Sequence, residues 1–221
     1  MDKLTKRAIL LLVACTTTTV VQAQSRLAVT ISGRPAGYAT ISQHLEKDGV
    51  KVVELRLELQ IQGHSVKVDS QARYDPKGMP SRKFQETITA DAGVHRQVVA
   101  TFDNSGASLV ILDGDKRSVK SVPLGASESR TNMSEFWFIR DIPKAGQVEE
   151  TRQFNMDSLQ WETVRTVFNG KKTLKIENHS VSVFEVVSKH GDQETTSYLD
   201  EHGLPILVDQ GGVKMVKIWA K

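Results

Sequence analysis

The sequence predicts an all-β fold, mainly antiparallel, that forms a strongly curved half-barrel or open barrel. Three observations support this prediction: segments in which apolar and polar residues alternate, turn-forming residues at nearly regular spacing, and one short aromatic segment near the middle. The 221 residues are ample for one domain and marginal for two. We therefore expect a single β-rich domain over residues 24–221, with the aromatic segment as one short central helix that plugs the curved sheet.

The clearest alternation lies in residues 52–62, which read VVELRLELQIQ. Leu55, Leu57 and Leu59 alternate with charged and amide side chains, and successive side chains of a strand point to opposite faces. One face of this strand is therefore apolar and the other polar. That pattern is typical of antiparallel sheets, because parallel strands are usually buried on both sides.

Turn signals divide the remaining chain into about a dozen strand-like segments, a number typical of an all-β sandwich or barrel. Asp48-Gly49 and Asn169-Gly170 are two-residue hairpin signals. Asn104–Gly106, Asp113–Asp115 and His190–Asp192 are further turns.

One turn motif occurs twice. Tyr74–Pro80 (YDPKGMP) and Leu199–Pro205 (LDEHGLP) share the order apolar, Asp, two residues, Gly, apolar, Pro. The Asp accepts backbone hydrogen bonds at the start of the turn, and the Gly takes the positive φ that closes it. Two interpretations stay open. The domain consists of two related halves that each end in this turn, or two similar hairpins arose independently.

The N-terminal residues predict export. Lys3, Lys6 and Arg7 precede a short apolar run, AILLLVA, and small residues follow, as in a secretory signal peptide. We expect residues 1–23 to be this signal, with cleavage after Ala23. The run is shorter than the roughly 20 residues that cross a membrane, so we expect no transmembrane span in the mature chain.

A lipoprotein signal over residues 1–14 is the alternative. Leu12–Cys15 resembles a lipobox, in which Cys15 would become the lipid-bearing first residue. The protein is then periplasmic or secreted under the first prediction, and an outer-membrane lipoprotein under the second. Because Cys15 is the single cysteine, we expect no internal disulfide in the mature domain despite its export.

The aromatic segment NMSEFWFIRDIPKAG covers residues 132–146. Asn132 followed by Glu135 has the form of a capping box, and Pro143 marks a helix end, so we expect a helix from about 133 to 140. A sheet with one apolar face must cover that face, and the helix would cover the concave side. Its side chains either complete the core or line a cavity for an apolar ligand. The candidate ligand-binding residues are Met133, Phe136, Trp137, Phe138 and Ile139.

Local catalytic signatures are missing from the sequence. Gly63-His64-Ser65-Val66-Lys67 lacks the second Gly of a serine hydrolase elbow. The histidines show no zinc-ligand spacing, and no Gly-rich phosphate loop is followed by Lys-Ser or Lys-Thr. The net charge of +3 gives no electrostatic footprint for nucleic acid. We therefore expect no enzyme, no catalytic or metal-binding residue, no cofactor and no nucleic-acid partner.

Four short motifs resemble a known kind of domain: GYATIS, YDPKGMP, SEFWFIRDIPKAGQ and YLDEHGLPILV. In these motifs the chain is similar to an uncharacterised bacterial envelope domain with a half-barrel fold like that of the LolA- and LolB-type lipoprotein carriers. The family pattern falls on Gly37-Tyr38, Ser134–Arg140 and Asp200–Pro205. The resemblance implies the fold, whereas lipid carriage follows only by analogy, because a fold does not fix a function.

Taken together, these observations predict a non-enzymatic cell-envelope protein that binds an apolar ligand, a lipid or an acyl chain, in the concave face of a β half-barrel. The alternative is a structural or scaffolding module that docks on another envelope protein. The expected partner is accordingly a hydrophobic small molecule or lipid, or an envelope protein.

Overall fold

The computed structural model describes residues 23–90, 93–125 and 144–219, and this part of the chain contains strands but no α-helix. The strands are β1 (Ala23–Ile31), β2 (Arg34–Leu45), β3 (Lys51–Ile61), β4 (His64–Tyr74), β5 (Pro80–Thr89), β6 (Val94–Asp103), β7 (Gly106–Asp113), β8 (Lys116–Pro123), β9 (Val148–Asn155), β10 (Gln160–Ile176), β11 (His179–His190), β12 (Gln193–Leu199), β13 (Pro205–Gln210) and β14 (Val213–Lys217).

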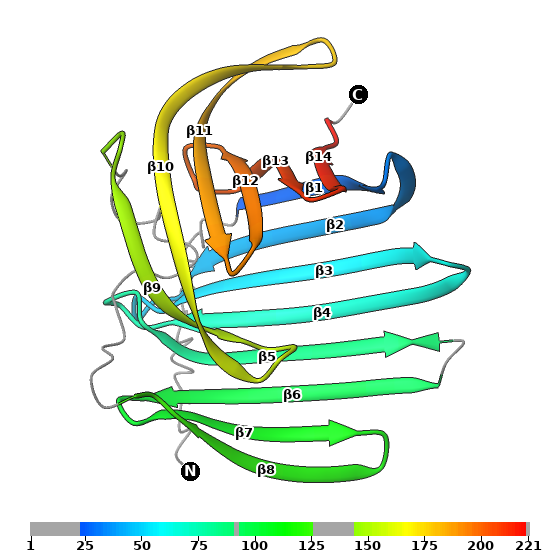
Figure 1. Ribbon diagram of the computed structural model, residues 1–221, viewed down its shortest axis with the longest axis vertical. Helices are drawn as coiled ribbons and strands as arrows, with labels where there is room; N and C mark the ends of the chain where they lie inside the picture. Colours follow the sequence, from blue (N-terminus) through cyan, green and yellow to red (C-terminus); the bar gives the residue numbers. More distant parts are fainter. Residues whose placement is uncertain (1–22, 91–92, 126–143, 220–221) are drawn as a thin grey trace, which may run out of the picture.

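All of the described strands belong to one antiparallel sheet, in the order β8-β7-β6-β5-β4-β3-β2-β1-β14-β13-β12-β11-β10-β9 (Figure 1). Strands β1–β8 form one meander and β9–β14 form a second. The two meanders join where β1 pairs with β14, near the middle of the sheet. The sheet is open, with β8 and β9 at its edges, which confirms the predicted all-β, antiparallel and open architecture.

The predicted alternation in residues 52–62 sets the two faces of the sheet. Leu27, Ala39 and Leu57 lie side by side on neighbouring strands and belong to one apolar cluster on the concave face. Arg56, the next residue along β3, points to the opposite face, where it forms an ion pair of 2.7 Å with Asp69 of β4. Around these strands the concave face is therefore apolar and the opposite face polar.

The two ends of the sheet overlap, because the β9–β10 hairpin lies inside the β6–β7 end. Phe154 of β9 and Trp161 of β10 pack edge-on against Phe102 of β6, with ring centroids 5.5 and 5.7 Å away. Trp161 Nε1 also donates a hydrogen bond of 3.2 Å to the Val122 carbonyl of β8. We call this cluster the seam; its buried members are Val98, Ala100, Phe102, Ala107, Leu109, Ile111, Leu124, Phe154, Met156 and Trp161.

The predicted hairpin at Asn169-Gly170 is wrong. Strand β10 continues through this position as one strand of 17 residues, and its register with β11 shifts between Phe168 and Gly170. Gly170 has φ of +94°, so the dipeptide forms a β-bulge. A bulge and a tight hairpin turn both require a left-handed residue, which is why the same sequence signal fits either structure.

The repeated turn motif forms the same structure twice. In each copy, Oδ1 of the Asp accepts backbone N–H groups two and four residues later, at 2.8 and 2.9 Å for Asp75 and at 2.9 Å twice for Asp200. Gly78 and Gly203 close the turns with φ of +83° and +80°. The prediction of a shared turn is confirmed, and the division into two related halves stays a prediction.

The predicted helix over 133–140 lies outside the described residues, so the helical plug gains no support from the described part of the chain. Within that part, other elements cover the concave face. The β9–β10 hairpin covers one region, and the turn before β13 covers another. Two strands hold this turn: Ser25 Oγ of β1 donates to the Pro205 carbonyl at 2.8 Å, and Gln43 Nε2 of β2 donates to the His202 carbonyl at 2.6 Å.

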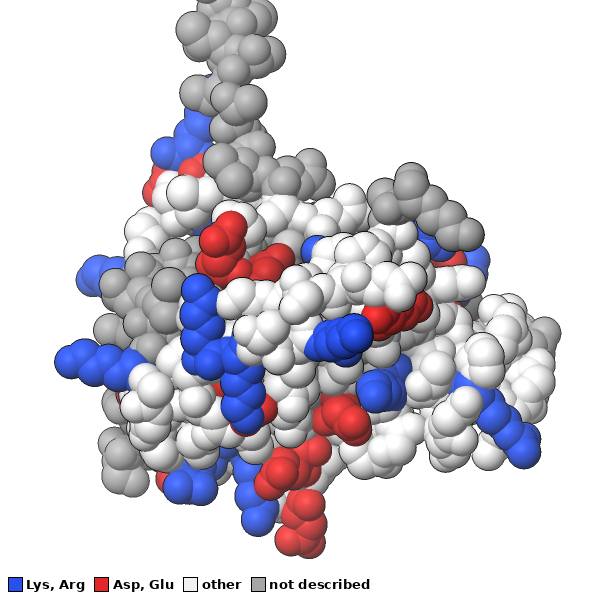
Figure 2. Space-filling model, turned by 90° about the horizontal axis from the view of Figure 1, so that it is seen from above, with Lys and Arg blue, Asp and Glu red and all other residues white. Residues whose placement is uncertain are grey.

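The signal peptide and Cys15 also lie outside the described residues, and Ala23 is the first residue of β1. Signal cleavage and lipidation therefore stay predictions. None of the described residues form a helix that is long and apolar enough to cross a membrane. On the face shown in Figure 2, basic and acidic side chains are interspersed.

Candidate functional site

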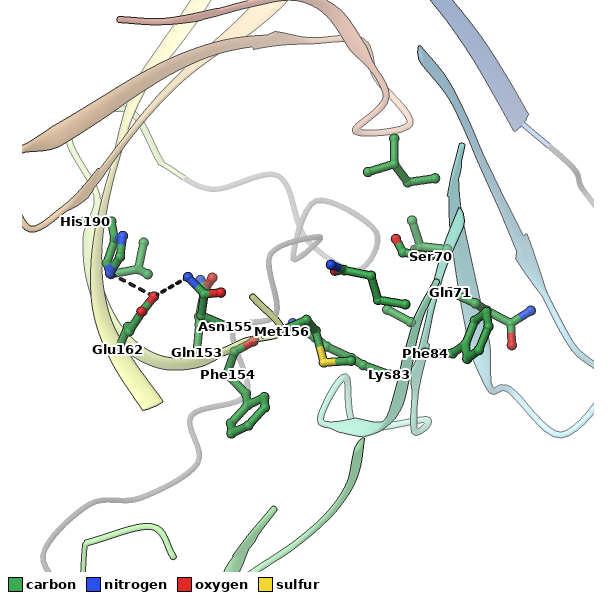
Figure 3. Close-up of a pocket in the computed structure, with 15 residues that line it drawn as sticks. Ser70, Gln71, Lys83, Phe84, Gln153, Phe154, Asn155, Met156, Glu162 and His190 are labelled. Carbon is green, nitrogen blue, oxygen red and sulfur yellow. Dashed lines mark hydrogen bonds and ion pairs between the residues drawn. The ribbon is translucent and has the colours of Figure 1, made fainter. Parts of the chain in front are cut away.

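The concave face encloses a hollow of about 380 Å³ (Figure 3). Strands β3, β4 and β5 form one wall, and β9, β10 and β11 form the other. The hollow exists because the β9–β10 hairpin rolls inward, so that concave-face side chains of the two meanders face each other across it. The hollow lies beside the seam, and Phe154 and Met156 belong to the seam and also line the hollow.

The β3–β4 wall is largely apolar. Val53 and Leu55 of β3 line it together with Ala72 of β4, which pairs with Val53. Val164 of β10 and Met156 provide apolar surface from the other side. Val53, Leu55, Ala72 and Val164 face inward because they occupy alternate positions of regular strands, which is the pattern that the sequence shows in residues 52–62.

The opposite wall carries a polar cluster centred on Glu162 of β10. Its Oε2 accepts a hydrogen bond of 2.8 Å from Asn155 Nδ2 and lies 2.8 Å from Nε2 of His190. Its Oε1 accepts a hydrogen bond of 2.7 Å from Ser158 Oγ. Figure 3 shows Asn155, Glu162 and His190 together on this wall of the hollow. The imidazole is 41% exposed, so His190 remains accessible to a molecule in the hollow.

This cluster does not have the geometry of a serine hydrolase triad. In a triad the imidazole lies between the hydroxyl and the carboxylate, so that it can take the proton of the nucleophile. Here the carboxylate of Glu162 lies in the centre, and Ser158 and His190 contact different oxygens of it. The arrangement can orient a polar group of a ligand, but it does not activate Ser158 as a nucleophile.

Two lysines lie on the inner wall opposite this cluster. Lys83 of β5 lines the hollow, is 9% exposed, and donates to the Phe154 carbonyl at 3.4 Å. Its neighbour on the same face, Gln85, donates to Asp157 Oδ1 at 2.6 Å. Both contacts connect the β5 wall to the β9–β10 hairpin.

The second lysine, Lys51 of β3, lies on the same face as Val53, two residues away, and is only 7% exposed. Its Nζ donates a hydrogen bond of 2.7 Å to Gln43 Oε1, and Gln43 in turn holds the His202 carbonyl. Burial lowers the pKa of Lys51 from 10.5 to about 7, because a low-dielectric site disfavours the ammonium form. Among the described residues, no carboxylate lies within ion-pair distance of Lys51.

The site residues predicted from the sequence, Met133, Phe136, Trp137, Phe138 and Ile139, lie outside the described residues. Their role as a ligand-binding group stays a prediction. Ser65 lies in the regular strand β4. The described residues contain no group of three or more His, Cys, Asp or Glu side chains that could hold a metal ion.

The hollow was not predicted residue by residue, because its walls are brought together by long-range packing. One sequence signal predicts part of the hollow. The register of the β10–β11 hairpin sets His190 opposite Val164, two residues from Glu162 along β10. Correct placement of the turn between β10 and β11 would therefore bring the imidazole close to this carboxylate.

One of the comparisons with known proteins supports the fold. A beta-barrel-like protein of the domain of unknown function DUF1849 from Brucella abortus matches with a TM-score of 0.58 and 10% identity, covering 88% of this chain and 93% of that chain. A DUF1089 family protein from Pseudomonas aeruginosa matches with a TM-score of 0.43 and 18% identity, covering 79% of this chain and 89% of that chain. No family model and no curated protein matches.

The first of these matches shows that the chain shares its fold with a barrel-like protein of unknown function. At 10% identity the likeness concerns the fold alone. The predicted resemblance to an uncharacterised domain is consistent with this result, whereas similarity to the LolA-type carriers is not shown.

Proposed function

We propose that the protein is a non-enzymatic cell-envelope protein that binds an apolar or amphipathic molecule, such as a lipid or acyl chain, in the hollow of its rolled sheet. The observation on which the proposal depends is the hollow of about 380 Å³ with an apolar β3–β4 wall. Small-molecule sites are concave and mostly apolar, with a few polar groups that orient the ligand, and measure about 300–1,000 Å³. The hollow fits this description in size and composition.

The apolar surface extends beyond the hollow. Ile41 of β2, Leu57 and Leu59 of β3, and Met215 of β14 are partly buried on the concave face, around the fully buried Leu27. Apolar side chains that stay partly exposed inside a curved sheet favour contact with an apolar chain, since removing their surface from water stabilises the complex. An elongated ligand therefore suits this face better than a compact one.

The location in the envelope comes from the N-terminal sequence. The basic residues and short apolar run predict export, and an exported chain without an internal disulfide must gain its stability from its core. The aromatic segment joins β8 to β9, the two edge strands, and we keep its side chains as further ligand-binding candidates.

A binding titration tests the proposal. Native mass spectrometry of the purified protein should show a bound apolar species, and a fluorescent fatty acid should bind and be displaced by unlabelled fatty acid. Ala72→Phe fills the hollow from the β4 wall, and we expect it to weaken binding at least about ten-fold. Ser118→Phe on the exposed strand β8 is the matched control. Absence of any bound or displaceable ligand in the wild type would overturn the proposal.

Docking on another envelope protein is the second candidate, favoured by the exposed edge strand β8, where Val119 is 65% exposed. A free edge can pair with a strand of a partner. However, Lys116, Arg117, Lys120 and Pro123 lie along the same strand, and charges and proline are the residues that block pairing at sheet edges. Crosslinking from position 119 in the envelope distinguishes the candidates, since only docking gives a specific protein adduct there.

A further inference from the structure

The polar cluster on the β10 wall is held in place by its own hydrogen bonds. Asn155 Oδ1 accepts the backbone N–H groups of Asp157 and Ser158, at 2.8 and 3.1 Å, so the turn between β9 and β10 fixes this amide. Asn155 Nδ2 and Ser158 Oγ then donate to different oxygens of Glu162. A carboxylate held in this way is a fixed acceptor for the remaining member of the cluster, His190.

The contact with Glu162 determines which nitrogen of the imidazole carries a hydrogen. An ionised carboxylate only accepts hydrogen bonds, and Nε2 of His190 lies 2.8 Å from Glu162 Oε2, so Nε2 is the donor. In the neutral ring Nδ1 is then an acceptor, and in the protonated ring Nδ1 is a second donor. The hydrogen-bond network therefore assigns the tautomer.

Nδ1 of His190 is the polar atom of this cluster that stays available to a ligand. None of the described residues forms a hydrogen bond with it, and the side chain is 41% exposed. His190 lines the hollow from β11, and Figure 3 shows it on the inner side of this wall. Val164, its pairing partner on β10, places apolar surface directly beside it. A polar head at Nδ1 therefore leaves an attached chain next to the apolar part of the hollow.

We propose that Nδ1 of His190 binds the hydroxyl head of a neutral single-chain amphipath, with Glu162 as the residue that positions the ring. This inference rests on the proposed function and specifies the head of the ligand. A hydroxyl both donates and accepts hydrogen bonds, so it matches the neutral and the protonated ring alike. A carboxylate head matches only the protonated ring, and it would lie close to the like charge of Glu162. An ammonium head matches only the neutral ring.

The test compares ligands that share a chain and differ in the head. Decan-1-ol, 1-chlorodecane, decanoate and decylammonium are titrated below their critical micelle concentrations by displacement of a fluorescent probe. The chloro compound keeps the chain and the approximate size of the head, but it cannot donate a hydrogen bond and accepts one only weakly. We expect decan-1-ol to bind about five-fold more tightly than each of the other three ligands, the effect of one net hydrogen bond.

A variant assigns this preference to the imidazole. His190→Phe keeps a planar ring and removes both nitrogens, so it should lower the affinity for decan-1-ol about five-fold and leave 1-chlorodecane binding unchanged. His64→Phe, at the exposed start of β4, is the matched control and should change neither affinity. Thermal melts check folding, and His190→Asn replaces His190→Phe if the latter does not fold.

Glu162→Gln tests the positioning role separately. The amide that replaces the carboxylate can either donate to Nε2 or accept from it, so the tautomer of the ring is no longer fixed. We expect the preference for decan-1-ol over 1-chlorodecane to shrink, whereas the affinity for 1-chlorodecane stays the same. An unchanged preference would show that Glu162 does not position the ring.

A spectroscopic measurement on the wild type does not depend on any variant binding a ligand. In protein labelled with ¹⁵N at histidine, the signals of His190 are those missing from the spectrum of the His190 variant. We expect the Nδ1 signal of His190 to shift when decan-1-ol is added and to stay in place when 1-chlorodecane is added. The Nδ1 signal therefore reports contact with the hydroxyl head directly.

Each negative outcome has its own meaning. If none of the four ligands binds, the proposed function fails. If decan-1-ol and 1-chlorodecane bind equally and the Nδ1 signal does not move, the head contact fails while the binding function survives. If decylammonium binds most tightly, the head is cationic and the inference is wrong. If decanoate binds most tightly, the inference is also wrong, because the cation of Lys83 then outweighs the imidazole in choosing the head.

Discussion

The two meanders meet at two places that differ in kind. Where β1 pairs with β14, a backbone ladder joins them, from Leu27 opposite Lys217 to Ile31 opposite Val213. At the seam they meet through side chains, chiefly Phe102, Phe154 and Trp161. The ladder fixes register because each hydrogen bond has a direction, whereas apolar packing at the seam is non-directional.

This difference shows how a sheet can form a barrel-like shape without pairing its edges. The roll is closed by packing, so closure depends on a few aromatic side chains and tolerates small displacements that a ladder would not. The hollow shares Phe154 and Met156 with the seam. Loosening the seam should therefore affect ligand binding, whereas changes at exposed ladder positions should not.

The largest effect is expected at the seam itself. Phe154 is 3% exposed, and truncation of a buried aromatic side chain costs about 3–5 kcal/mol. We expect Phe154→Ala to lower the free energy of unfolding by that amount in denaturant titrations. Lys214→Ala, at an exposed position of the β14 ladder, should change it by less than about 0.5 kcal/mol. Similar small values for both variants would show that the seam does not hold the roll closed.

The next effect concerns the region beside the ladder, where Lys51 lies beneath the turn before β13. The lowered pKa of Lys51 means that the unfolded chain binds a proton more readily than the folded protein between pH of about 7 and 10.5. Stability therefore rises with pH in that window, and the burial penalty is fully present below it. Lys51→Met removes this dependence without a change at the seam.

We expect Lys51→Met to be more stable than the wild type at pH 6, and the advantage to shrink by about 2–3 kcal/mol at pH 9, at 1.36 kcal/mol per pKa unit. Urea unfolding at both pH values measures the difference, and Lys67→Met on the outer face serves as the control. An advantage that is equal at the two pH values would show that Lys51 is not desolvated.

A smaller effect tests how the seam depends on backbone spacing. A Cβ at Gly106 would lie 2.3 Å from the Val122 carbonyl oxygen, the same oxygen that accepts the Trp161 hydrogen bond. Gly114 also has positive φ, but a Cβ there meets nothing within 4 Å. We expect Gly106→Ala to cost about 1–3 kcal/mol more than Gly114→Ala, measured by thermal or urea unfolding. Equal costs would mean that the close approach of β7 to β8 does not matter to the seam.

The sequence predicted the sheet better than its closure. Alternation in residues 52–62 identified β3 and its apolar face because strand geometry imposes a period of two. The paired Asp turns were predicted because their hydrogen bonds are local. Asn169-Gly170 was assigned to a hairpin because positive φ at Gly170 serves a bulge as well as a turn. Local signals therefore predicted the strands, but they did not distinguish a bulge from a turn at Asn169-Gly170.

The hollow could not be predicted from such local signals. Lys83 and Glu162 lie in ordinary strand patterns, and only the inward roll of the β9–β10 hairpin brings their walls together. Burial of Lys51 is likewise a tertiary effect. Alternation predicts the face of the sheet on which Lys51 lies, but it does not predict which residues pack over that face. The sequence predicted an apolar concave face, but it placed the binding residues in the aromatic segment, and the polar groups of the hollow came from the structure.

The pairing of β1 with β14 has a consequence for how the chain reaches this fold. The first strand finds one of its two neighbours only after the last strand has been synthesised. Contacts of such high sequence separation slow folding, because a long loop must close before they form. Such a delay would suit the export that we propose, since a polypeptide that cannot complete its sheet early stays unfolded long enough to be carried across a membrane.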